Sequence, residues 1–167
     1  MKIPTYKFAV LEELKNHDPS FIPFKAHPTD TGWDVRAHIP APYNSLTINK
    51  NEYVRINLGF RCFCPPGWWL ELRPRSSTFA KKFMHCLYGV IDNGYENICM
   101  LAAQYVPDVS APTTIEIFNG DAIGQIIPVK LQNMKVEEIS NQEYNELCQS
   151  RNSKRGTGGF GSSSTKV

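Results

Sequence analysis

The chain has 167 residues, with 41% hydrophobic and 20% charged residues and a formal net charge of +2, a balance that excludes disorder throughout and suits one globular domain. No apolar run approaches the roughly 18 residues of a membrane-spanning helix, and we expect no signal peptide. The odd number of five cysteines favours reduced thiols in a cytoplasmic protein.

Charge is distributed unevenly along the chain. Residues 1–150 hold all 16 acidic residues and 14 of the 18 basic residues, so this part carries a net charge of −2. Residues 151–167 contain four basic residues, no acid, and mainly glycine and serine between them. We therefore expect a domain over 1–150 and a flexible glycine-rich tail over 151–167. The small overall charge does not indicate a nucleic acid partner.

Most predicted elements are short strands that end at turn signals such as Pro65-Pro66-Gly67. Short helices are predicted over 9–16 and 78–83, and a capping box at 140–143 opens another over 141–148. Alternating or continuous apolar residues predict strands over 53–58, 60–64, 68–73, 97–106, 114–118, 123–127 and 134–139. This regular spacing indicates an all-β sandwich or barrel.

The stretch Arg73-Pro74-Arg75-Ser76-Ser77-Thr78 leaves a predicted strand and enters a predicted helical turn. A helix N-terminus with free N–H groups, hydroxyls and an arginine suits a phosphate group. A serine cap beside a surface arginine is the simpler alternative, and this stretch alone does not decide between them.

Two Asn-Gly pairs, Asn93-Gly94 and Asn119-Gly120, stand between apolar runs and predict hairpins. The first hairpin leaves the flanking Asp92 and Tyr95 unexplained, although an aspartate beside a turn is often only a turn former. The stretch 29–36 has two acids around a glycine, which favours a turn over a metal site.

The glycines of 155–164 allow backbone N–H groups to wrap an anion, although no Lys-Ser/Thr follows them as in a Walker loop. Phe160 is an aromatic residue that a solvated linker does not need. Cys62-x-Cys64 and the four histidines lack the spacing of a zinc site, so we expect no transition metal ligated by the protein.

Taken in order, these stretches resemble the five motifs of the trimeric dUTP diphosphatase (dUTPase) family. The version Pro74-Arg75-Ser76-Ser77-Thr78-Phe79 resembles a phage-related branch of that family. The five matching stretches are Gly32-Trp33-Asp34-Val35, Pro74-Arg75-Ser76-Ser77, Gly89-Val90-Ile91-Asp92-Asn93-Gly94-Tyr95, Gly120-Asp121-Ala122-Ile123-Gly124-Gln125 and Arg155-Gly156-Thr157-Gly158-Gly159-Phe160-Gly161-Ser162.

The resemblance implies a distorted jelly-roll β-barrel that assembles as a homotrimer with shared active sites. It implies hydrolysis of dUTP to dUMP and pyrophosphate with Mg²⁺, through water attack on the α-phosphate. The 151–167 tail is then a mobile lid, and the implied location is the cytoplasm, or the host cytoplasm for a phage protein.

The resemblance also implies a role for each matching residue. Asp92 activates the water, Tyr95 packs beneath the deoxyribose and excludes a 2′-hydroxyl, and Asp34 holds the water shell of the metal. The implied substrate contacts are Arg75, Ser76, Ser77 and Gln125 at the phosphates, Gly89, Ile91 and Met100 at the uracil, and Arg155, Phe160, Gly161 and Ser162 from the tail.

Some positions depart from the family pattern, namely Trp33, Ser77, Ala122 and the pair Glu96-Asn97. These departures bear on rate and regulation more than on the class of activity.

Two alternatives stay open. A dCTP deaminase has the same fold and a similar hairpin, but Ala102 and Ala103 stand where its catalytic glutamate is expected. The other alternative is a non-catalytic regulatory protein that binds dUTP on this scaffold.

Overall fold

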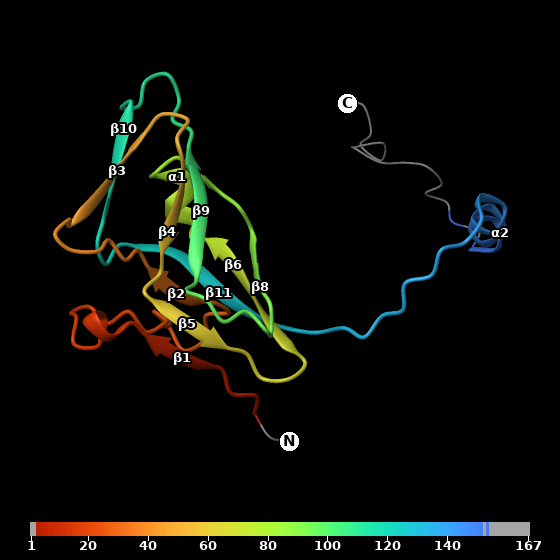
Figure 1. Cartoon of the computed structure of the whole chain (residues 1–167). Helices are drawn as coiled ribbons and strands as arrows, with labels where there is room; N and C mark the ends of the chain where they lie inside the picture. Colours follow the sequence, from red (N-terminus) through yellow and green to blue (C-terminus); the bar gives the residue numbers. More distant parts are fainter. Residues whose placement is uncertain (1–2, 152, 154–167) are drawn as a thin grey trace. The chain divides into compact units, whose positions relative to one another are not determined.

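The structure is a computed structural model that describes residues 3–151 and residue 153 (Figure 1). Contacts along the chain divide it into two compact units, Met1–Gln132 and Asn133–Val167. The division therefore falls at Gln132, before the boundary at residue 150 that the sequence suggested.

The described part of the first unit is built almost entirely of short strands, as the spacing of turn signals predicts. In chain order its elements are β1 (Lys7–Val10), the 3-10 helix η1 (Glu12–Leu14), β2 (Trp33–Arg36), β3 (Ser45–Asn49), β4 (Tyr53–Asn57), β5 (Phe60–Phe63), β6 (Trp68–Pro74), α1 (Ser76–Ala80), β7 (Met84–Cys86), β8 (Gly89–Ile91), β9 (Met100–Tyr105), β10 (Thr114–Phe118) and β11 (Ala122–Lys130).

Antiparallel pairing joins these strands into small sheets with the orders β1-β5, β10-β3, β2-β11-β6-β8 and β4-β9-β7. Most pairs join strands that are distant in the sequence, which is typical of Greek-key and jelly-roll architectures. β11 is the longest of the described strands and lies between β2, which carries Asp34, and β6, which leads to Arg75.

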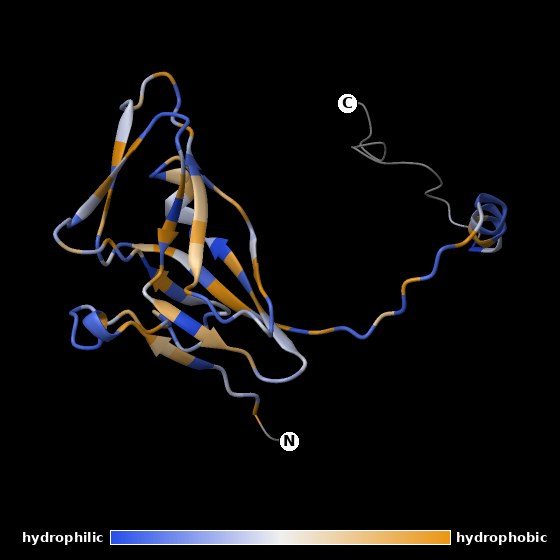
Figure 2. Cartoon of the chain, viewed as in Figure 1, coloured by the Kyte–Doolittle hydropathy of each residue, from blue (hydrophilic) through white to orange (hydrophobic). Residues whose placement is uncertain are grey.

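The core lies between the inward faces of these strands, and Figure 2 shows hydrophobic and hydrophilic residues alternating along several of them. In β6, Leu70 and Leu72 are only 1% and 2% exposed, so this face of the strand packs in the core. Cys62, Cys64 and Cys99 are buried in the same core. Burial raises the pKa of the Cys99 thiol to about 12 and raises that of Cys62 as well.

Several expectations need correction. The predicted helix over 9–16 is instead the end of β1 followed by η1, because Lys7–Val10 pairs with β5. Residues 134–139 are not a strand: they have no regular structure, and Val136 is 98% exposed. Strands β2 and β3 were not predicted, since their residues lie near turn signals and are held by pairing with β11 and β10.

Both Asn-Gly pairs form turns, but neither turn is a hairpin between its flanking strands. The N–H of Tyr95 donates to the carbonyl of Asp92 at 3.1 Å, and the N–H of Asp121 donates to the carbonyl of Phe118 at 3.0 Å. However, β8 pairs with β6 while β9 pairs with β4 and β7, and β10 pairs with β3 rather than β11.

In the second unit, α2 (Asn141–Arg151) is polar and has no buried residue. Ser140 caps this helix as the capping-box pattern predicts for the serine, because the N–H of Glu143 donates to Ser140 Oγ at 3.1 Å. Among the helices that the structure describes, none is long and apolar enough to cross a membrane.

Candidate active site

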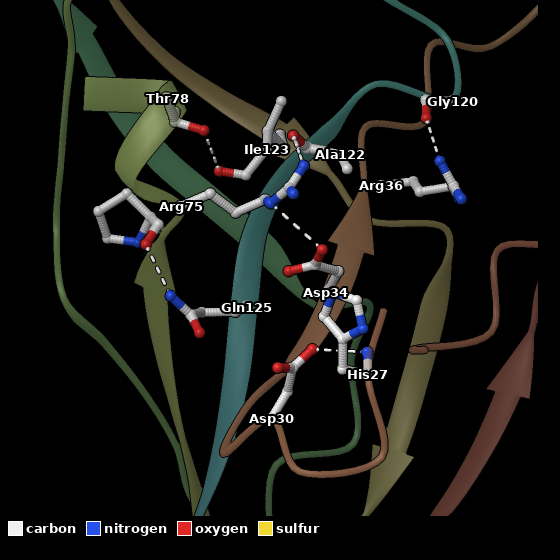
Figure 3. A network of polar contacts seen from close by, with 11 residues as sticks. His27, Asp30, Asp34, Arg36, Arg75, Thr78, Gly120, Ala122, Ile123 and Gln125 are labelled. Carbon is white, nitrogen blue, oxygen red and sulfur yellow. Dashed lines mark hydrogen bonds and ion pairs between the residues drawn. The ribbon is translucent and has the colours of Figure 1, made fainter. Parts of the chain in front are cut away.

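The register of β11 brings three predicted site residues into one neighbourhood. Gln125 of β11 stands opposite Asp34 of β2, and on the other side it stands opposite Arg73 of β6. Arg75 follows β6 directly, so its side chain starts at the edge of the same sheet. Figure 3 shows the side chains of Asp34, Arg75 and Gln125 close to one another.

An ion pair holds the Arg75 guanidinium in this group. Its Nε lies 3.2 Å from Asp34 Oδ2, and the two side chains are 37% and 17% exposed. Its Nη1 donates to the carbonyl of Ala122 at 3.4 Å, and its backbone N–H donates to Ile123 at the same distance. The guanidinium is therefore orientated by β2 and β11 while remaining partly open to solvent, as an anion-binding arginine requires.

Helix α1 carries the two serines of the same motif. Ser76 is exposed and Ser77 half-buried, whereas Thr78 is only 1% exposed and donates from Oγ1 to the carbonyl of Ile123 at 2.7 Å. This buried bond fixes the first turn of α1 against β11 (Figure 3). Lys82 adds a second tie to the same region, because its Nζ lies 2.9 Å from Asp121 Oδ2.

The Gln125 amide is fixed by its surroundings. Its Nε2 donates to the carbonyl of Pro74 at 3.3 Å. Gly32 packs against the same side chain so closely that an added Cβ would lie 2.6 Å from Gln125 Oε1. A side chain at position 32 would therefore have to displace the Gln125 amide.

Asp92 and Tyr95 lie in a different place, on an exposed turn over 92–97. The Tyr95 hydroxyl donates to the carbonyl of Ile98 at 3.1 Å, and its side chain is 40% exposed. The turn borders a cavity of about 580 Å³, whose other walls include Lys7 and Phe8 of β1 and Arg61 and Phe63 of β5.

The Arg75 group and the 92–97 turn stand at opposite ends of β6. Ile91, just before Asp92, pairs with Leu70 near the start of β6, whereas Pro74, just before Arg75, ends it. At roughly 3.4 Å per residue, these two ends and the residues beyond them are about 20 Å apart. The chain therefore gathers Asp34, Arg75 and Gln125, but it does not bring Asp92 or Tyr95 to them.

The remaining predicted site residues lie away from the Arg75 group or outside the described part of the chain. Gly89 and Ile91 belong to β8, and Met100 begins β9 with 41% of its surface exposed. Arg155, Phe160, Gly161 and Ser162 lie outside the residues that the structure describes. Sequence reasoning missed Thr78 and Lys82 as supports of the site, because only the fold reveals their partners on β11 and the turn before it.

Comparison with known proteins identifies the family of this chain. A family model described as dUTPase matches residues 18–164. A deoxyuridine 5'-triphosphate nucleotidohydrolase of Rhodococcus erythropolis is 28% identical over 156 residues, which cover 90% of this chain and 84% of that protein. The corresponding protein of Gloeobacter violaceus is 29% identical, over 85% of this chain and 88% of its own.

Solved structures show the same fold. The dUTPase of Staphylococcus bacteriophage 80alpha with dUPNHPP superposes with a TM-score of 0.75 and 19% identity, covering 98% of this chain and 99% of that one. A dUTPase from phage phi11 of S. aureus gives a TM-score of 0.67 over 82% of this chain and 97% of its own. These likenesses confirm the expected dUTPase-like β fold.

Proposed function

Because this chain belongs to the dUTPase family and is a dUTP diphosphatase, we propose that its active site is assembled from two chains. One chain contributes Asp34, Arg75, Ser76, Ser77 and Gln125, and a second contributes the turn with Asp92 and Tyr95. The observation that carries this proposal is the separation of the two groups at opposite ends of β6 within one chain.

The Arg75 group binds the triphosphate. The guanidinium is orientated by Asp34 and by the carbonyl of Ala122, so it gains charge-assisted hydrogen bonds to phosphate with little reorganisation. Ser76 and Ser77 add hydroxyl donors at the start of α1, and Gln125 stabilises the turn that presents them through Pro74. Positioning and charge neutralisation are the main requirements of phosphoryl chemistry.

Magnesium fits this donor set. Mg²⁺ takes oxygen ligands and keeps several of its waters, so it needs few ligands from the protein. Asp34, which lies beside Arg75, would hold the water shell of the ion. When bound, the ion would supply charge neutralisation on the phosphates.

Asp92 and Tyr95 of the second chain act at the reacting end of the nucleotide. The exposed Asp92 carboxylate orientates and deprotonates the water that attacks the α-phosphate, releasing dUMP and pyrophosphate. The Tyr95 ring packs beneath the deoxyribose and excludes a 2′-hydroxyl. Gly89, Ile91 and Met100 border the uracil, on the strands before and after the turn.

The proposal includes a homotrimer, the closed assembly that gives three such shared sites. It also includes residues 151–167 as a glycine-rich lid, with Arg155 on phosphate, Phe160 over the base, and Gly161 and Ser162 closing the loop. The five unpaired cysteines support a cytoplasmic location.

Pyrophosphate release from dUTP, compared with dTTP, dCTP and UTP with and without Mg²⁺, tests the substrate and the metal. Asp92→Asn should keep nucleotide binding and lower turnover by about 10²–10⁴-fold. Asp108→Asn is a matched control, because Asp108 is exposed and bonds only within its own loop. Near-normal turnover in Asp92→Asn would remove Asp92 as the base, and ammonia release from dCTP would indicate a deaminase.

A further inference from the structure

The turn that carries Asp92 and Tyr95 has few attachments to the rest of the chain. The ladder between β6 and β8 ends at Ile91, and all of residues 92–97 are exposed. Within the described residues, the hydrogen bonds that leave the 92–98 segment come from one side chain, that of Asn93.

The Asn93 amide faces three carbonyl groups. Its Nδ2 donates to Cys64 at 3.1 Å, Pro65 at 2.9 Å and Trp68 at 3.2 Å. Two N–H groups are therefore shared among three acceptors, and an amide oxygen in that place would meet only other acceptors.

The acceptors lie on a rigid support, the turn over 64–68 between β5 and β6. Cys64 is only 1% exposed, and the N–H of Trp68 donates to the carbonyl of Pro65 at 3.1 Å. Gly67 accepts a further bond from the N–H of Leu131 at 2.8 Å. Two consecutive prolines restrict the backbone of this turn.

We propose that Asn93 is a positioning residue for dUTP hydrolysis, because its amide fixes the 92–97 turn to the 64–68 turn and so sets where Asp92 and Tyr95 stand. The inference rests on the proposed role of Asp92 as the base. The N–H of Tyr95 donates to the carbonyl of Asp92, so one attachment sets both side chains together. A catalytic group displaced by about 1 Å can lower a rate by about 10²-fold.

The test is a double-mutant cycle on kcat with Asn93→Ala and Asp92→Asn. Asn93→Ala should lower kcat by about 10- to 100-fold and weaken binding of a non-hydrolysable dUTP analogue by a smaller factor. In the Asp92→Asn background, the same change should alter the remaining kcat by less than about twofold. The reason is that the base whose position Asn93 sets is already missing from that variant. Asn44→Ala is the matched control, an exposed asparagine in the loop before β3, and it should leave kcat unchanged.

A second variant, Asn93→Asp, has the same shape but places a carboxylate against the three carbonyls, so it should also release the turn and lower kcat. The proposal is overturned if folded Asn93→Ala keeps kcat within twofold of wild type. It is equally overturned if the fold-losses in kcat of the two single variants multiply in the double variant. It is also overturned if both Asn93 variants unfold, since the residue would then be purely structural. Normal turnover in Asp92→Asn alone is a separate result, which refutes the base assignment whatever Asn93 does.

Discussion

Mixing two inactive variants should restore activity if each active site takes Arg75 from one chain and Asp92 from another. Arg75→Ala removes the guanidinium proposed to bind phosphate but keeps Asp92, whereas Asp92→Asn removes the proposed base but keeps Arg75. In one chain the two positions lie at opposite ends of β6, about 20 Å apart at roughly 3.4 Å per residue. No rearrangement within a folded chain is therefore expected to bring them together.

The size of the restored activity follows from chance pairing. In randomly exchanged trimers made from equal amounts, a site works only when one contributing chain keeps Arg75 and the other keeps Asp92, so about one quarter of the sites should be active. A complementary mixture gives a sharper contrast. When wild type is exchanged with an equal amount of the double variant, about one quarter of all sites in the mixture should be active if sites are shared, and about one half if each chain holds its own.

Pyrophosphate release from dUTP measures the activity after subunit exchange, and native mass spectrometry with a tag on one variant verifies that mixed trimers form. Each variant put through the same exchange alone provides the baseline, which should be low because loss of a general base costs about 10²–10⁴-fold. Verified mixed trimers that stay inactive, or one half of the activity in the second mixture, would refute the shared site.

Two further predictions concern the supports of the site, and a third concerns a buried histidine of the core. Thr78→Val removes the bond to the carbonyl of Ile123 and should lower the free energy of unfolding by about 1–3 kcal/mol in denaturant titration, whereas Thr78→Ser should not. Gly32→Ala should displace the Gln125 amide and raise the KM for dUTP with little change in melting temperature; wild-type kinetic constants would contradict the close packing. His38 is 5% exposed and burial lowers its pKa below 6.5, so the unfolded chain binds the extra proton and stability should fall as pH drops below about 6.5. A His38→Gln variant that melts with the same pH dependence as wild type would refute that last prediction.

The turns were predictable from sequence, whereas the strand pairing around them was not. Asn93-Gly94 and Asn119-Gly120 form turns because their backbone preferences are local. Which strands then pair depends on contacts between distant parts of the chain, and both turns connect strands of different sheets. In the same way, 114–118 was predicted with the bounds it has, but its partner β3 was not recognised as a strand.

The candidate site shows the same limit. The resemblance named Asp34, Arg75 and Gln125, but only the register of β11 shows that they share one neighbourhood. The prediction of a strand over 134–139 was wrong. Alternating apolar residues can form one apolar face, but a strand also needs a neighbouring strand to pair with, which the pattern does not reveal. The Asn-Gly pattern explains Asn93 as a turn residue, and its proposed positioning role depends on the three carbonyls that face it, which only the fold shows.

The burial of cysteines also determines how this protein reacts with thiol reagents. Thiolate is the reactive form, and burial raises the pKa of Cys99 to about 12 and that of Cys86 to about 11, so both stay protonated near neutral pH. Cys62 and Cys64 are buried as well, whereas Cys148 of α2 is exposed. A maleimide dye should therefore attach first at Cys148 in the native sequence. The second unit can thus carry a fluorescent reporter without any cysteine being removed from the core.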